Sequence, residues 1–139
     1  MADFENISDE ILERCSTLQW LVPNTKRGTD IVVKPWNISK QTATFLYLIG
    51  KSIHAKNILE LGTSAGYSTL WLAKLAKENN GHVDTIEKFQ RKADVAKKHF
   101  MEAQLDQYIT LYEKNILEVL KSYTKPLDFI FMDADRTNY

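Results

Sequence analysis

Two glycines, Gly62 and Gly66, separate an apolar run at residues 57–61 from a stretch with helical periodicity that begins at Tyr67. Glycines let a strand-to-helix turn close tightly and let a ligand approach the backbone. The helix that follows presents free N–H groups, which suit a carboxylate or a phosphate. The spacing is Gly-x-x-x-Gly and not the Gly-x-Gly-x-x-Gly of dinucleotide sites, and no P-loop lysine follows. The turn predicts a ligand site of another kind, although glycines here are also ordinary structural punctuation.

An acidic residue, Glu87, follows a second apolar run at residues 82–86. It lies about twenty residues beyond the glycine turn, where dinucleotide-binding folds place a carboxylate that accepts hydrogen bonds from ribose hydroxyls. A carboxylate at a strand end is otherwise a routine solvated or capping residue. The glycines upstream favour the ribose interpretation.

A third group of polar residues follows the last apolar run and comprises Asp133, Asp135 and Arg136. Hard carboxylate oxygens are suitable ligands for Mg²⁺ or Ca²⁺. One or two carboxylates do not complete an octahedral site, so water, substrate or residues outside this chain would supply the remaining ligands. The alternative is that Asp133 caps a following helix.

Short apolar runs alternate with amphipathic stretches from Lys56 onward, which is typical of βαβ units. The predicted strands are residues 57–61, 82–86, 108–112 and 127–132. The predicted helices between them are residues 67–79, 89–104 and 116–123. This order predicts a Rossmann-like, doubly wound, mostly parallel α/β sheet. A sheet ending at residues 129–132 would leave an exposed apolar edge, which native sheets avoid, so we expect a further C-terminal part.

The N-terminal region, residues 1–55, is predicted to be a helical cap within one domain spanning residues 1–139. A first helix is expected at about residues 8–20 with Ser8 as N-cap, and Ser39 is expected to cap a second helix. Between them, residues 22–36 break the pattern and are predicted to form an irregular loop.

The chain has 139 residues, 44% of them hydrophobic, with 18 Lys+Arg balancing 18 Asp+Glu. This fits a soluble globular domain, and no apolar run approaches the roughly 20 residues of a membrane helix. Zero net charge argues against nucleic acid or a membrane surface as partner.

Cys15 is the only cysteine, which excludes an internal disulfide. The start of the sequence lacks a signal-peptide pattern, so a cytoplasmic location is expected. The three histidines show no ligand spacing and are expected at surface or boundary positions.

The glycine turn, the acid at Glu87 and the segment around Asp133 together resemble one family. Residues 35–139 are similar to class I S-adenosylmethionine-dependent O-methyltransferases of the catechol and caffeoyl-coenzyme A type. Residues 59–68 resemble the family's first motif, residues 85–87 its ribose-binding acid, and residues 128–135 with 138–139 its metal-site motif. The resemblance implies the N-terminal two thirds of such an enzyme, truncated after the fourth strand.

The resemblance also implies roles for particular residues. Glu60, Gly62 and Gly66 would shape the cofactor pocket. Thr63 and Ser64 would line it, Ser68 would hold the methionine carboxylate, and Glu87 would bind the ribose. Asn115 would contact adenine. Asp133 would be the first metal ligand, close to the cofactor's methyl group.

Two departures from the family pattern bear on catalysis. The family's lysine three residues after the metal aspartate is here Arg136, which stabilises an oxyanion but stays protonated and does not act as a general base. The acceptor hydroxyl would then lose its proton through metal coordination. The family's next strand supplies an Asp-Asn pair that completes the metal site, and this pair is absent. We therefore expect an incomplete enzyme, with Asp133 and Arg136 as its catalytic residues.

The predicted function is methyl transfer from S-adenosylmethionine to a hydroxyl of a small molecule, assisted by a divalent cation (Mg²⁺ or Ca²⁺). Three alternatives remain: a non-catalytic or truncated cofactor-binding fragment, a nicotinamide-dependent oxidoreductase domain, and an RNA methyltransferase. The missing Gly-x-Gly-x-x-Gly argues against the second, and a basic helix at residues 88–98 is too weak a sign for the third. The apolar edge and the first helix are compatible with a homodimer.

Overall fold

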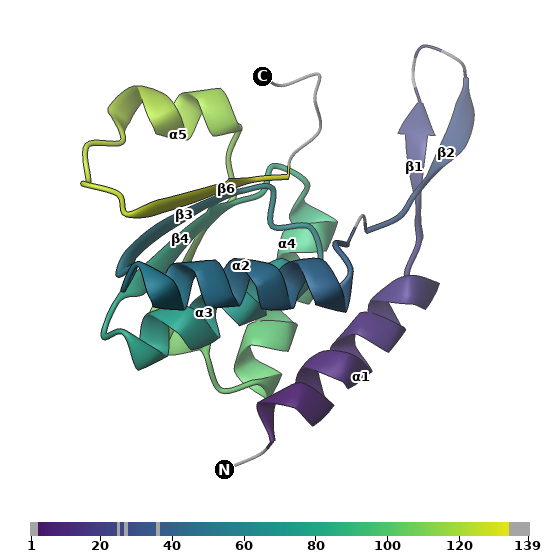
Figure 1. The fold of residues 1–139 in the computed structure, drawn as a ribbon. Coiled ribbons are helices and arrows are strands. Elements are labelled where there is room, and N and C mark those ends of the chain that lie inside the picture. The colour runs from purple at the N-terminus through teal and green to yellow at the C-terminus, as the bar shows by residue number, and fades with distance from the viewer. Residues whose placement is uncertain (1–2, 25, 27, 36, 134–139) are drawn as a thin grey trace.

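A computed structural model of the chain describes residues 3–24, 26, 28–35 and 37–133. Its centre is a sheet of four parallel strands (Figure 1). In spatial order the strands are β5 (Ile109–Tyr112), β4 (His82–Ile86), β3 (Asn57–Leu61) and β6 (Phe129–Met132). The chain runs outward from β3 to β5 and then returns to the other side of β3. This order confirms the predicted doubly wound α/β sheet and places its switch point between β3 and β6.

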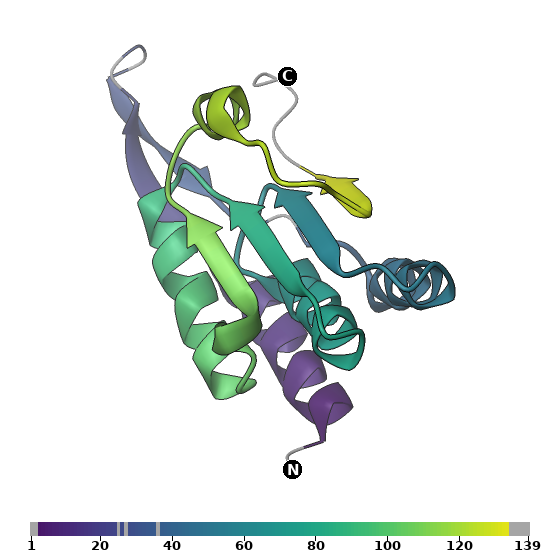
Figure 2. The ribbon, with the colours of Figure 1, turned by 90° about the vertical axis from the view of Figure 1, so that its left-hand side faces the viewer.

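Helices cover both faces of the sheet (Figure 2). One face carries α5 (Ile116–Ser122), while α3 (Tyr67–Glu78) and α4 (Gln90–Glu102) lie on the other. The N-terminal helices α1 (Phe4–Thr17) and α2 (Lys40–Ser52) lie on the same side as α3. The predicted helices after residue 56 are therefore confirmed, with ends that shift by one or two residues.

The core divides into two layers because side chains alternate along each strand. On the α3 side, Ile58 and Val83 pack with the apolar residues of α3. On the α5 side, Leu59, Leu61 and Ile86 pack with that short helix. Helix α3 is buried along nearly its whole length, which makes it the central support of the sheet.

The first helix begins earlier than the sequence indicated. Asp3 is its N-cap, and the Asp3 Oδ1 accepts a hydrogen bond from the Glu5 N–H at 3.0 Å. The prediction of Ser8 as N-cap was wrong, because Ser8 lies inside the helix and its Oγ donates to the Glu5 carbonyl at 3.0 Å. Ser39 caps α2 as predicted.

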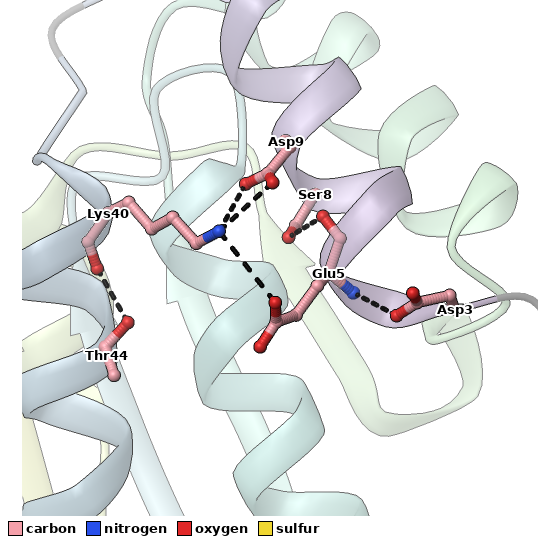
Figure 3. A network of polar contacts seen from close by, with 6 residues as sticks. All are labelled: Asp3, Glu5, Ser8, Asp9, Lys40 and Thr44. Carbon is pink, nitrogen blue, oxygen red and sulfur yellow. Dashed lines mark hydrogen bonds and ion pairs between the residues drawn. The ribbon is translucent and has the colours of Figure 1, made fainter.

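The helices α1 and α2 are joined through Lys40 (Figure 3). The Lys40 Nζ lies 3.0 Å from Asp9 Oδ1 and 4.0 Å from Glu5 Oε2. These groups are exposed, so solvent screens the pairs and they add little to stability. They fix the relative placement of the two helices more than they strengthen the fold.

A β-hairpin occupies most of the region that the sequence analysis left as an irregular loop. Strand β1 (Trp20–Asn24) pairs antiparallel with β2 (Thr29–Val33), so the loop prediction was wrong for these residues. The register sets Pro23 opposite Asp30. A two-stranded ribbon has only edge strands, where a residue without an N–H is tolerated. The predicted helical cap at residues 1–55 thus contains two helices and a hairpin.

The hairpin contacts the beginning of α4. The Trp20 and Phe89 rings meet edge to face, with 6.0 Å between their centroids. The Arg91 Nη1 donates to the Leu21 carbonyl at 3.1 Å. These contacts place the hairpin on the same side of the molecule as the end of β4.

The outer edge of β6 has no strand beside it among the residues that the structure describes. Ile130 and Met132 on this strand are 53% and 55% exposed. This agrees with the apolar edge predicted from the sequence. Within the described part of the chain, no helix is both long and apolar enough to cross a membrane.

Candidate functional site

The candidate site lies where β3 ends and the chain turns into α3. Gly62 and Gly66 have φ angles of +100° and +93°, and Ser64 between them has φ +52°. Gly66 is the N-cap of α3 and brings no side chain to cap it. Within the described part of the chain, no side chain caps the first N–H groups of α3, which leaves them free to bind an anion.

Gly66 is also required by its surroundings. A Cβ at this position would lie 2.7 Å from Phe100 Cε1 and 3.1 Å from the Ala96 Cβ, both on α4. The positive φ and the close approach of α4 both demand glycine.

A buried carboxylate, Glu60, organises the polar groups beneath the turn. Its side chain is fully buried and accepts hydrogen bonds from the hydroxyls of Ser68, Thr69 and Thr85. Burial raises the pKa of Glu60 from 4.5 to about 7, although the three hydroxyl donors oppose the rise. Glu60 joins β3, β4 and the first turn of α3 in one network.

The number of protons on each hydroxyl decides which group donates and which accepts in this network. The Thr85 hydroxyl donates its proton to Glu60 Oε1 at 2.8 Å, and its oxygen lies 2.6 Å from the Thr63 Oγ1. Because a hydroxyl has one proton, Thr63 must donate to Thr85. With Glu60 ionised, three hydroxyls donate to its carboxylate, and the Thr63 hydroxyl donates to Thr85.

Glu87 connects the end of β4 to the glycine turn. Its Oε1 accepts the Ser64 N–H at 2.8 Å and its Oε2 accepts the Phe89 N–H at 3.0 Å. Each carboxylate oxygen keeps further acceptor capacity. The two residues predicted to bind one cofactor, Ser64 and Glu87, thus lie within hydrogen-bonding distance although they are 23 positions apart in sequence.

Among the residues that the structure describes, the buried Ser64 hydroxyl has no hydrogen-bond partner. An unpaired buried polar atom is uncommon in a folded protein and calls for an explanation. Its place in the glycine turn, beside the Glu87 carboxylate, is what a site with an absent polar ligand would show.

Two further predicted residues lie at the same carboxyl edge of the sheet. Asn115 caps α5, and its Oδ1 accepts the Leu117 N–H at 2.9 Å. Asp133 follows β6, and its N–H donates to the Leu61 carbonyl at 3.0 Å. Partial desolvation raises the pKa of Asp133 above its ordinary value. Arg136 and Asp135 lie outside the described residues.

The described residues do not form a metal centre. Among residues 3–24, 26, 28–35 and 37–133, no group of three His, Cys, Asp or Glu side chains is arranged to hold an ion. Asp133 alone offers one carboxylate at the end of β6, too few ligands for an octahedral cation. The donor set at the glycine turn fits a polar organic cofactor, whereas the donor set at Asp133 does not by itself fit a metal.

A protein-family model described as O-methyltransferase matches residues 7–139. The chain belongs to the O-methyltransferase family. It is 37% identical over 107 residues to a catechol O-methyltransferase of Niastella koreensis, covering 74% of this chain and 48% of that protein. It is 34% identical over 114 residues to caffeoyl-CoA O-methyltransferase 2 of Populus trichocarpa, covering 76% and 46%.

Solved structures of O-methyltransferases share the fold. The O-methyltransferase of Bacillus cereus in complex with SAH superposes with a TM-score of 0.74 at 28% identity, covering 96% of this chain and 56% of that one. A putative O-methyltransferase of Klebsiella pneumoniae gives a TM-score of 0.74 at 31% identity, covering 95% and 55%. The chain spans about half the length of the curated relatives it matches.

Sequence reasoning missed two groups in this O-methyltransferase domain. Thr69 and Thr85, which donate to Glu60, were not predicted, and their role becomes visible only when Glu60 and Thr85 pair in register across β3 and β4. His99 was expected at a surface or boundary position and is instead 2% exposed. The sequence feature that could have indicated burial of His99 is its position on the same helical stripe as the apolar residues Ala96 and Phe100.

Proposed function

We propose that this chain is the cofactor-binding part of an O-methyltransferase that transfers a methyl group from S-adenosylmethionine to a hydroxyl of a small molecule. The observation that carries the proposal is the link between Glu87 and the glycine turn, beside the unpaired Ser64 hydroxyl and the uncapped start of α3. Relatives named for catechol and caffeoyl-CoA support a hydroxyl acceptor.

In this proposal each part of the cofactor has its own contacts. Glu87 accepts hydrogen bonds from the ribose hydroxyls, and Asn115 lies at the neighbouring loop for the adenine. Gly62 and Gly66 admit the cofactor, with Thr63 and Ser64 lining its path. Asp133 lies toward the methyl group.

The methionine carboxylate meets the start of α3. The uncapped N–H groups there are its natural donors. Ser68 is also proposed to hold it, but its proton is directed to Glu60 while Glu60 is ionised. Protonated Glu60 would release Ser68 to donate to the carboxylate, and burial raises the pKa of Glu60 in the direction that favours this form.

The sulfonium cofactor supplies an electrophilic methyl group when bound. The chain's own contribution is to hold the cofactor and acceptor in line, because transfer between two bound groups depends mainly on their orientation. Arg136, proposed to stabilise the acceptor oxyanion, stays protonated throughout and takes up no proton. A divalent cation remains part of the proposal only as a ligand to be tested, with Asp133 as its one described candidate, and no step here depends on it.

Calorimetric titration of the chain with S-adenosylhomocysteine, with and without Mg²⁺, tests the proposal. We expect micromolar binding that Glu87→Ala reduces at least about tenfold, because hydrogen bonds to a charged group contribute about 1.5–3 kcal/mol. Glu13→Ala, which removes an exposed carboxylate from α1, is the matched control and should bind as the wild type does. Absence of binding by the folded chain would overturn the cofactor assignment.

Two additions to this titration test the oxidoreductase and the non-catalytic alternatives. Competition by NAD would favour an oxidoreductase domain over a methyltransferase. A chain that binds S-adenosylhomocysteine but transfers no methyl group to a catechol would be a non-catalytic cofactor-binding unit.

A further inference from the structure

The buried His99 on α4 donates a hydrogen bond to the glycine turn. Its Nδ1 lies 2.7 Å from the Ala65 carbonyl oxygen. A carbonyl only accepts, so the Nδ1 carries the proton. Burial lowers the pKa of His99, and the charged groups that act on it are Arg14 of α1 and Glu102 of α4, which pair with each other at 2.9 Å. The imidazole is therefore neutral at pH 7, with its proton on Nδ1.

The Ala65 carbonyl belongs to the peptide group that joins Ala65 to Gly66. The N–H of the same peptide group, on Gly66, donates to the Thr63 carbonyl at 2.9 Å. His99 and Thr63 thus hold the two polar ends of one peptide plane. Since a peptide group is rigid, fixing both ends fixes its orientation.

This peptide plane sits between the two parts of the turn that are proposed to meet the cofactor. Before it comes Ser64, with its left-handed φ of +52° and its N–H on Glu87. After it comes the uncapped first turn of α3. A rotation of the plane would move both the Ser64 hydroxyl and the N–H groups of α3.

Helix α4 supports the same plane by packing. Ala96, His99 and Phe100 lie on one stripe of the helix, and Ala96 and Phe100 approach Gly66 so closely that no Cβ fits there. Two members of the stripe supply van der Waals contact, and the third supplies a hydrogen bond. Burial of a polar side chain in this apolar stripe costs free energy unless the side chain makes a hydrogen bond.

We propose that His99 is a positioning residue of the cofactor site, which orients the Ala65–Gly66 peptide so that the glycine turn is ready for its ligand. It does not touch the ligand itself. This inference rests on the proposed function, because the ligand in question is S-adenosylmethionine.

Three substitutions test it by titration with S-adenosylhomocysteine. His99→Leu keeps much of the volume but removes the donor, and leaving the buried carbonyl unpaired should weaken binding about tenfold. His99→Asn places an amide N–H near the position of Nδ1 and should bind within about threefold of the wild type, a difference of about 0.6 kcal/mol. His82→Asn, which changes an exposed histidine bound to Thr110, is the matched control and should bind normally.

Each titration is performed well below the unfolding midpoint of its variant, so that loss of folded protein does not imitate loss of affinity. Unchanged affinity in His99→Leu would reduce His99 to a purely structural residue and overturn the proposal. Equal weakening in His99→Leu and His99→Asn would overturn the role of the donor. Nitrogen NMR of the imidazole gives an independent test, because we expect a neutral ring protonated on Nδ1, and a ring protonated on Nε2 would contradict the hydrogen bond.

A failure of the proposed function is distinguishable from a failure of this inference. If the wild-type chain does not bind S-adenosylhomocysteine, amide hydrogen exchange at Ser64 and Gly66 still reports on the turn. We expect faster exchange in His99→Leu than in His99→Asn. Equal exchange rates in the two variants would overturn the positioning role even without a ligand.

Discussion

The two sides of the candidate site are built differently. On the β3–β4 side, Glu60 and Glu87 are held by five hydrogen bonds from hydroxyls and backbone N–H groups. On the β6 side, Asp133 has an exposed side chain, and the strand before it presents Ile130 and Met132 to solvent. The groups proposed to meet the ribose and the methionine carboxylate lie within residues 57–105, whereas Asp133 is the one described carboxylate proposed at the acceptor side.

From this difference we expect cofactor binding to depend less on the β6 edge than acceptor chemistry does. The turn is supported by its own strand, by α3 and by α4, whereas β6 reaches it through the hydrogen bond from the Asp133 N–H to the Leu61 carbonyl. Three changes to the chain test this contrast.

The largest effect is expected from Gly66→Ala. The added Cβ meets Phe100 at 2.7 Å in a backbone conformation that disfavours side chains. We expect a loss of at least about 3 kcal/mol in the free energy of unfolding, together with loss of S-adenosylhomocysteine binding. Urea unfolding and calorimetry measure the two effects.

Gly28→Ala is the control for that substitution. Gly28 also has a positive φ, of +67°, but nothing lies within 4 Å of an added Cβ. Its cost should be that of the backbone alone, about 1 kcal/mol, with binding retained. Equal costs at Gly28 and Gly66 would show that α4 does not support the turn.

A pH-dependent effect is expected from Glu60. Its pKa is about 7 in the folded chain and near 4.5 when unfolded, so the folded state binds more protons between these values. The free energy of unfolding should therefore fall as pH rises from about 4.5 to about 7. Glu60→Gln does not titrate and should lack this fall, which amounts to about 3 kcal/mol.

Urea unfolding of both proteins at pH 5 and pH 8 makes the comparison. The difference between the two pH values should be larger in the wild type than in Glu60→Gln. Parallel losses would mean that Glu60 is not buried as the network requires, and the contrast between the two sides of the site would weaken.

The smallest effect is expected at the β6 edge. Ile130→Ala removes a side chain that is already 53% exposed and should change the free energy of unfolding by less than about 0.5 kcal/mol. Ile58→Ala on the neighbouring strand removes one that is 1% exposed and should cost about 3 kcal/mol. A large cost at Ile130 would show that something covers the edge in solution, and light scattering would reveal whether that is a second copy.

Much of the sheet could be predicted because each parallel strand is a short apolar run. The strands at residues 57–61 and 82–86 match β3 and β4 at both ends. The hairpin of β1 and β2 could not be predicted, because Pro23 interrupts the first strand and Gly28 stands directly before the second. Proline argues against a strand unless the strand lies at an edge, and an edge is a tertiary property.

The parts of the candidate site that directly follow a strand in the sequence could be predicted. The glycine turn and the acid after β4 are adjacent to their own strands, and the structure brings Glu87 to Ser64. The support for the turn was not predictable, because His99 lies in a helix rich in lysine and its partner, Ala65, is 34 residues away. The roles of the individual residues in binding and catalysis stay predictions.

The contact between Trp20 and Phe89 has a practical consequence. The Phe89 N–H donates to the Glu87 carboxylate. The tryptophan ring therefore packs against a residue that is bonded to the carboxylate proposed to bind the ribose. Indole emission responds to changes in its immediate surroundings. Trp20 is one of three tryptophans, so with Trp36 and Trp71 replaced by phenylalanine its emission would serve as an optical reporter of ligand binding at Glu87 without any added label.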